Sequence, residues 1–125
     1  MTPQKEIEAT LATMFAQWNA EDQASYLTHY RDSDELRWSM KGLWYKGLSS
    51  MKAVYGQGFP PGAMGITKIF EVEVQMLTED IGVALYRWTH EFPHEIIAGC
   101  TSQIFRKLGG RWLVVHENSA RVPKD

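Results

Sequence analysis

The length and composition of the chain indicate one ordinary folded domain. Its 125 residues, of which 44% are apolar and 22% charged, are enough to bury a core without a metal or a disulfide. The formal charge of -2, with no run of Lys or Arg, excludes the basic surface that nucleic-acid binding requires. The single cysteine, Cys100, has no intrachain partner, and no segment approaches the roughly 18 apolar residues of a membrane span. The charged start lacks the apolar core of a signal peptide, so we expect a cytoplasmic protein with no membrane or nucleic-acid partner.

The first segment is predicted to be helical. Apolar residues recur every three or four positions from Ile7 to Trp18, and Thr2 followed by proline suits an N-cap and a first turn. These signals predict a helix over residues 3–19, followed by a shorter helix that begins at Asp22.

The next segment is expected to form a hairpin and a third helix. Aromatic residues flank Lys41 and Gly42, and glycine permits the positive φ of a tight turn between two short strands. After this hairpin, Ser49 or Ser50 is a candidate helix cap, and the helix is expected to end near Gly56. The proline- and glycine-rich stretch FPPGAMG that follows is expected to be a loop.

The second half of the chain changes from a helical to an alternating pattern. Four apolar residues alternate with polar ones and are expected on one face of a long strand: Phe70, Val72, Val74 and Met76. Three further runs, separated by turn signals, are expected to be strands: residues 81–92, 98–108 and 111–122. Helices followed by an antiparallel meander predict an α+β fold.

The order of elements and some local sequence resemble the SnoaL-like branch of the nuclear transport factor 2-like superfamily. The C-terminal stretch SQIFRKLGGRWLVVHENS resembles the family's last hairpin, in which a Gly turn is followed by Trp and an H-x-N pair before Ser. YRWTHEF is similar to the central strand of the calcium/calmodulin-dependent protein kinase II association domain, and DQASYLTHYRD is similar to the family's second helix. The resemblance implies one SnoaL-like domain over residues 1–125. Its sheet would be cone-shaped, curved and antiparallel, wrapped around the N-terminal helices as in a cystatin-like α+β barrel, and would enclose a pocket.

The resemblance also implies positions for the pocket wall. Carried over residue by residue, the pocket of the association domain falls on Arg87, Gln103 and Ser119, and the general-base position of ketosteroid isomerases falls on Trp38. Aromatic side chains from the helices, the hairpin and the following loop are expected to complete a ligand pocket: Trp18, Tyr26, Trp38, Tyr55 and Phe59.

The faces of the sheet follow from two assumptions. If Arg87 faces the pocket, alternation sends Trp88 and His90 to the opposite face. If Gly110 is a left-handed bulge residue in the last hairpin, the pocket face carries Gln103, Phe105, Leu113, Val115, Glu117 and Ser119. The other face would then be too aromatic to remain in water, which predicts a homodimer through Trp88, His90, Ile104, Trp112 and His116.

Three functions stay open at the level of sequence. A small-molecule binding domain would hold an acidic or polar-headed organic ligand through Arg87, unless that residue forms an internal ion pair with Glu117. A cofactor-independent isomerase, cyclase or dehydratase would use a desolvated Glu117 as its general base. An oligomeric assembly module would have no pocket ligand. The four histidines and Cys100 lack metal-ligand spacing, so we expect neither a metal nor a cofactor.

Overall fold

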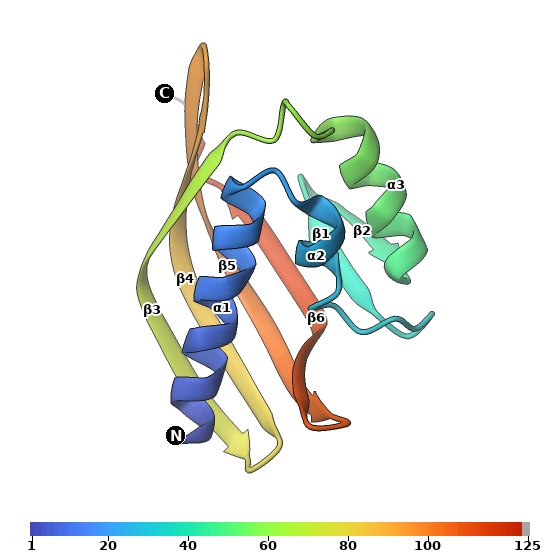
Figure 1. Ribbon diagram of the computed structural model, residues 1–125, viewed down its shortest axis with the longest axis vertical. Coiled ribbons are helices and arrows are strands. Elements are labelled where there is room, and N and C mark those ends of the chain that lie inside the picture. The colour runs from blue at the N-terminus through green and yellow to red at the C-terminus, as the bar shows by residue number, and fades with distance from the viewer. Residues whose placement is uncertain (124–125) are drawn as a thin grey trace.

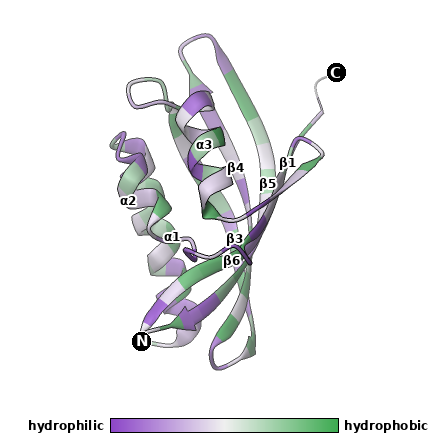
Figure 2. Cartoon of the chain, turned by 90° about the vertical axis from the view of Figure 1, so that its right-hand side faces the viewer, coloured by the Kyte–Doolittle hydropathy of each residue, from purple (hydrophilic) through white to green (hydrophobic). Residues whose placement is uncertain are grey.

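The structure is a computed structural model that describes residues 1–123 as three helices against one curved, unclosed sheet. The six strands lie in the order β2-β1-β6-β5-β4-β3. All neighbouring strands are antiparallel except β1 and β6, which run parallel. The helices lie on the concave side of the sheet, which we call the inner face (Figures 1 and 2). The predicted α+β fold is therefore confirmed.

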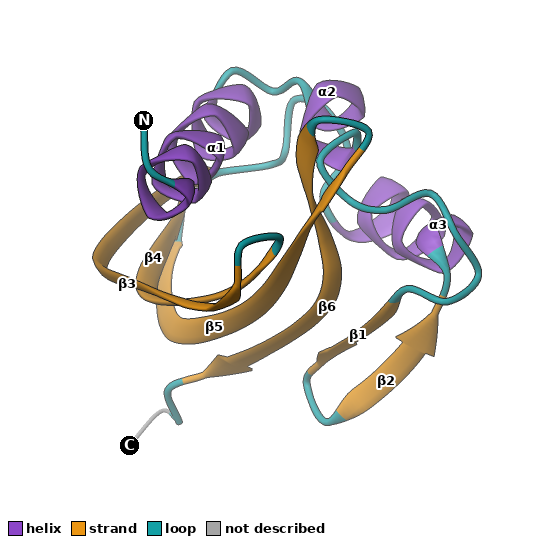
Figure 3. Cartoon of the chain, turned by 90° about the horizontal axis from the view of Figure 1, so that it is seen from below, coloured by secondary structure: helices purple, strands orange, loops and turns teal. Residues whose placement is uncertain are grey.

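Helix α1 (Pro3–Asn19) has the predicted bounds because both of its local signals are satisfied. The Thr2 side chain accepts a hydrogen bond from the backbone N–H of Lys5, which caps the first turn. The apolar stripe of the helix is buried against the inner face of the sheet and consists of Ile7, Leu11, Met14 and Trp18. Figure 3 shows α1 on the concave side, over the β3 and β4 part of the sheet. No described helix is long and apolar enough to cross a membrane.

The short elements that follow build the opposite side of the concavity. Helix α2 (Gln23–Leu27) is capped by the Asp22 side chain, as predicted, and the strands β1 (Arg37–Met40) and β2 (Leu43–Lys46) form the predicted hairpin. The N-cap of helix α3 (Leu48–Gly58) is Gly47, which precedes both predicted serine caps by two or three residues. Ser50 therefore lies within the first turn, where its hydroxyl donates to the Gly47 carbonyl and accepts from the Trp38 indole.

The four long strands are β3 (Ile66–Thr78), β4 (Ile81–Phe92), β5 (Glu95–Leu108) and β6 (Arg111–Arg121). A bulge in β3 interrupts its alternation at Glu71, whose φ is 52°. The bulge turns Phe70 to the outer face, where it is exposed, whereas Val74 and Met76 pack on the inner face. The prediction that Phe70 shares a face with Val74 is therefore wrong.

The predicted faces of β4 are reversed in the structure. Ala84, Tyr86 and His90 are buried on the inner face, and Arg87 points outward with a side chain that is 65% exposed. The reason is the pairing of β4 with β5, which sets Ala84 opposite the buried Gln103. Residues directly opposite each other in a sheet share a face, so a buried Gln103 requires an outward Arg87.

The last hairpin differs from its predicted register by one residue. Gly109 and Gly110 both have positive φ and form a two-residue turn, so that Leu108 pairs with Arg111 and no bulge occurs at Gly110. This register places Trp112 and Val114 on the inner face, where both are buried. A bulge at position 115 then restores the predicted inner face for the rest of β6.

Candidate functional site

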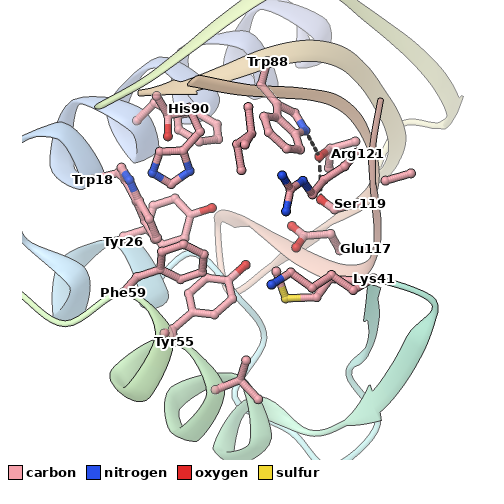
Figure 4. Close-up of a pocket in the computed structure, with 18 of the residues that line it drawn as sticks. Trp18, Tyr26, Lys41, Tyr55, Phe59, Trp88, His90, Glu117, Ser119 and Arg121 are labelled. Carbon is pink, nitrogen blue, oxygen red and sulfur yellow. Dashed lines mark hydrogen bonds between the residues drawn. The ribbon is translucent and has the colours of Figure 1, made fainter. Parts of the chain in front are cut away.

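A cavity of about 470 Å³ lies between the three helices and the inner face of the sheet. This volume is in the range of small-molecule sites. Its walls are mainly rings, as Figure 4 shows, contributed by α1, α2, α3, β2 and β4. The ring-bearing residues that line it are Phe15, Trp18, Tyr26, Tyr45, Tyr55, Phe59, Tyr86, Trp88, His90 and Phe92.

Glu117 forms the floor of the cavity with a side chain that is only 2% exposed. Its Oε1 atom accepts hydrogen bonds from the Tyr30 hydroxyl at 2.6 Å and from Gln103 Nε2 at 2.5 Å. Its Oε2 atom receives no hydrogen bond from any described residue, and Figure 4 shows the carboxyl group directed into the cavity. One oxygen is thus held by the protein and the other is available to a ligand.

Burial raises the pKa of the Glu117 carboxyl, and the hydrogen bonds from Tyr30 and Gln103 lower it by less. Both donors are neutral. The carboxyl group is therefore easier to protonate than an exposed glutamate, which is the property that general acids and bases in apolar sites share.

Tyrosine hydroxyls surround Glu117. The hydroxyls of Tyr26 and Tyr30 are hydrogen-bonded at 3.1 Å, and the Tyr30 hydroxyl donates to Glu117. Burial first, and the negative charge of Glu117 second, raise the pKa of the hydroxyls of Tyr26, Tyr30, Tyr55 and Tyr86. These hydroxyls stay protonated at physiological pH and can donate hydrogen bonds to a ligand or to Glu117.

A second polar chain runs along the sheet beside the floor. The Trp88 indole donates to the Thr101 hydroxyl at 2.9 Å, and Thr101 contacts the Ser119 hydroxyl at 2.6 Å, as the dashed lines in Figure 4 show. All three residues line the cavity. Because hydroxyls rotate freely between donor and acceptor roles, this chain can serve either kind of ligand group.

The loop between α3 and β3 closes one side of the cavity. The Met64 carbonyl accepts from the Trp18 indole at 3.2 Å and bonds to His90 Nε2 at 2.5 Å. Phe59, at the start of the loop, stacks on His90 and on Phe92. Burial lowers the pKa of His90, which therefore stays neutral at physiological pH and holds the loop as a hydrogen-bond donor.

Most of the residues expected in a pocket are brought together by the structure. Glu117 and Ser119 line the floor, and aromatic side chains line the walls at Trp18, Tyr26, Tyr55 and Phe59. Gln103 lies beneath the floor, where it holds Glu117. Trp38 lies behind the wall, stacked on Tyr45 with ring centres 4.3 Å apart.

The prediction that Arg87 faces the pocket is wrong. Its side chain pairs with Glu71 on the outer face, and both side chains are 65% exposed. Neither Arg87 nor any other cation contacts Glu117 among the described residues, so the internal Arg87–Glu117 pair considered above does not form.

The predicted dimer-interface residues are divided between the two faces. Trp88 and His90 line the cavity, and Trp112 is buried beneath α1, where its indole donates to Glu6 at 3.1 Å. Only Ile104 and His116 lie on the outer face, paired with each other. The physical reason is the register of β4 and β6 described above, which turns the indole rings toward the helices.

Sequence reasoning missed several residues of the cavity: Lys41, Tyr86, Trp88, His90 and Arg121. A signal for part of this set was present, since Ala84, Tyr86 and Trp88 are a more apolar alternating set than Val83, Leu85 and Arg87. No group of three His, Cys, Asp or Glu side chains within residues 1–123 is arranged to hold a metal ion.

The sequence matches no protein-family model and no curated protein. Solved structures are similar in fold. A nuclear transport factor 2-like protein of unknown function from Shewanella oneidensis is 21% identical, with a TM-score of 0.88 over 93% of this chain and 97% of that chain. A ketosteroid isomerase-like protein from Erwinia carotovora is 17% identical, with a TM-score of 0.79 over 97% of both chains.

A calcium/calmodulin-dependent protein kinase II association domain reported from Xanthomonas campestris is also similar. It is 14% identical, with a TM-score of 0.76 over 96% of this chain and 88% of that chain. The chain therefore has the nuclear transport factor 2-like fold, as its sequence pattern indicated. Because this fold carries unrelated functions, the site and not the fold has to indicate what the protein does.

Proposed function

We propose that the cavity binds a small organic molecule with an apolar, ring-containing body and a hydroxyl or carbonyl group that bonds to Glu117. The observation that carries this proposal is the arrangement of the Glu117 carboxyl. One of its oxygens is held by Tyr30 and Gln103, and the other faces an aromatic cavity of about 470 Å³. The second oxygen accepts no hydrogen bond from a described side chain, so a ligand hydroxyl that reaches it would gain a hydrogen bond to this carboxyl group.

The aromatic walls support a flat or cyclic ligand. Rings supply large contact areas at low entropic cost, and the Trp18 ring contacts three other lining rings edge to face, which fixes the shape of this wall. A few polar groups among them would fix the orientation of the ligand, as in ordinary small-molecule sites.

The experiment is calorimetric titration at pH 8 with 2-naphthol and with 2-methoxynaphthalene, which cannot donate a hydrogen bond. We expect saturable binding of 2-naphthol, and binding of the ether that is weaker by several-fold. The preference for the hydroxyl should shrink in Glu117→Gln, because a neutral amide accepts more weakly than a carboxylate. It should persist in Glu71→Gln, which removes a carboxylate from the outer face. Equal binding of the two compounds, or no binding of either, would contradict the proposal.

A second candidate function is proton transfer without a cofactor, as in an isomerase. It is favoured by the raised pKa of Glu117 and by the neutral tyrosine hydroxyls around it, which could stabilise negative charge on a ligand oxygen. The test is the rate at which the protein isomerises a cyclic β,γ-unsaturated ketone, measured from pH 4 to 9. A rate that rises with ionisation of one group and falls by about 10²-fold or more in Glu117→Gln would support it. A rate equal to that of buffer would exclude this reaction.

A further inference from the structure

The cavity has a buried floor and an exposed mouth. Glu117 and Tyr86 at the floor are buried, whereas Lys41, Glu95 and Arg121 are exposed lining residues at the ends of their strands or in the adjoining turn. The mouth is therefore formed by the β1–β2 turn, the start of β5 and the end of β6. A ligand seated on Glu117 would have its other end at these side chains.

The parallel pairing of β1 with β6 places two cations together at this mouth. Met40 pairs with Ser119, so Lys41 follows at the end of β1 beside the last residues of β6, which include Arg121. Both side chains line the cavity, and Figure 4 shows the Lys41 amine and the Arg121 guanidinium turned toward its interior. Arg121 forms an ion pair with Glu95, with 3.7 Å between a guanidinium nitrogen and a carboxylate oxygen, whereas Lys41 makes no ion pair with any described residue.

The backbone at Lys41 is unfavourable for lysine. Lys41 has a φ of 54° and Gly42 a φ of 79°, which makes the two-residue link between Met40 and Leu43 a type I′ turn. Asn, Asp and Gly suit the first position of such a turn, and other side chains are strained there. A lysine in this place is therefore poorly explained by the stability of the hairpin, and a strained residue at a cavity mouth suggests a role for its side chain.

We infer that the mouth of the cavity recognises a carboxylate on the ligand through Lys41 and Arg121. This inference rests on the proposed binding function and names the ligand class as a ring-containing acid. Glu117, Ser119 and Arg121 occupy alternate positions on one face of β6, so the backbone positions of Glu117 and Arg121 are four residues, or roughly 13 Å of strand, apart. The ligand therefore carries its hydroxyl or carbonyl group at one end and its carboxylate at the other.

The probe is 6-hydroxy-2-naphthoate, which has a hydroxyl and a carboxylate at opposite ends of two fused rings. Its carboxamide serves as the uncharged match. We expect the carboxylate to bind on the order of tenfold more tightly than the carboxamide, equivalent to about 1.4 kcal/mol. The preference should decline with added salt because the mouth is open to solvent.

The variants separate recognition from structure. Lys41→Met should reduce the preference for the carboxylate, and Lys41→Met combined with Arg121→Met should abolish it. Lys46→Met is the matched control, because Lys46 lies on the adjacent strand with its amine over the exposed Trp44 ring and does not line the cavity. Lys41→Asn should reduce the preference as much as Lys41→Met does while raising the melting temperature, since asparagine suits the turn.

Three results would overturn the inference. The first is equal binding of carboxylate and carboxamide by the unaltered protein, which would leave the proposed binding function intact. The second is a loss of carboxylate preference in Lys46→Met as large as that in Lys41→Met, which would mean that the preference reflects only the overall positive charge near the surface. The third is failure of both probes and of 2-naphthol to bind, which would contradict the proposed function together with the inference.

Discussion

Replacing Tyr30 with phenylalanine tests how the protein holds the buried Glu117 carboxyl. Tyr30 does not line the cavity, so the change removes one hydroxyl without altering the surface that a ligand would touch. The hydroxyl donates to Glu117 at 2.6 Å and lies 3.1 Å from the Tyr26 hydroxyl. Its removal leaves Oε1 of Glu117 with Gln103 as its only donor among the described residues.

The loss in the free energy of unfolding should depend on pH. A hydrogen bond to a charged group contributes about 1.5–3 kcal/mol, and one between neutral groups about 0.5–1.5 kcal/mol. Because burial raises the pKa of Glu117 above 4.5, the native carboxyl is protonated at pH 4. The stability associated with the protonated form is present below 4.5 and is lost as the pH rises through the pKa of the folded state. Tyr30→Phe removes a donor that stabilises the ionised form, so its cost should grow over the same window.

The assay is urea unfolding of the unaltered protein and of Tyr30→Phe at intervals from pH 4 to pH 9, with Tyr45→Phe as the control. Tyr45 packs on Trp38, and its hydroxyl forms no hydrogen bond with a described residue, so the effect of Tyr45→Phe should not vary with pH. We expect the cost of Tyr30→Phe to rise by about 1 kcal/mol between the two ends. A cost that is the same at every pH, or a gain in stability, would refute the reasoning about Glu117.

Further predictions concern residues away from the floor. Arg87→Ala should cost less than about 1 kcal/mol in the free energy of unfolding, because its ion pair with Glu71 is exposed. It should also leave the binding of 2-naphthol unchanged, and a loss of binding by calorimetry would mean that Arg87 contributes to the pocket. Burial lowers the pKa of His90 below 6.5, so the unfolded state binds more protons than the native state below that pH. The free energy of unfolding should therefore fall as the pH drops below 6.5. His90→Gln should make this fall shallower in urea unfolding, and an unchanged pH dependence would contradict the prediction. We expect a homodimer through the outer face, where Phe70 and Leu85 are exposed on neighbouring strands, and Phe70→Glu should give a monomer by light scattering; a monomeric unaltered protein would refute it.

The bounds of α1 and the start of α2 could be predicted because their signals are local. The spacing from Ile7 to Trp18 and the Thr2 cap define α1 from end to end, and Asp22 caps α2 by the same chemistry. Such signals depend on residues within one or two turns of one another, which a single sequence displays directly.

The faces of the sheet could not be predicted because they depend on pairing between distant strands. Both alternating sets in β4 contain apolar residues, so the pattern alone did not decide between Tyr86 and Arg87 for the inner face. The bulges at Glu71 and at position 115 each change which residues point inward, and neither has a clear sequence signal. The predicted inner face for Glu117 is correct only because two errors compensate. The predicted turn shifts the register of β6 by one residue, and the bulge at position 115, which was not predicted, shifts it back.

The cationic mouth was missed for a related reason. Lys41 was recognised as a turn residue, but its neighbourhood depends on the parallel pairing of β1 with β6, which joins segments about 80 residues apart in the chain. No pattern within either segment indicates that the turn lies beside the end of β6. A lysine before glycine in a predicted two-residue turn, where Asn, Asp or Gly is usual, is the local sequence sign that fits the role inferred for its side chain.

The crystal structure of the protein with 2-naphthol tests the central claim most directly, since it locates the ligand relative to Glu117. The account predicts the rings within the aromatic walls and the hydroxyl within about 3 Å of Glu117 Oε2. It also predicts that Oε1 keeps its bonds to Tyr30 and Gln103. A ligand bound elsewhere, or an Oε2 atom already bonded to a side chain of the protein, would contradict it.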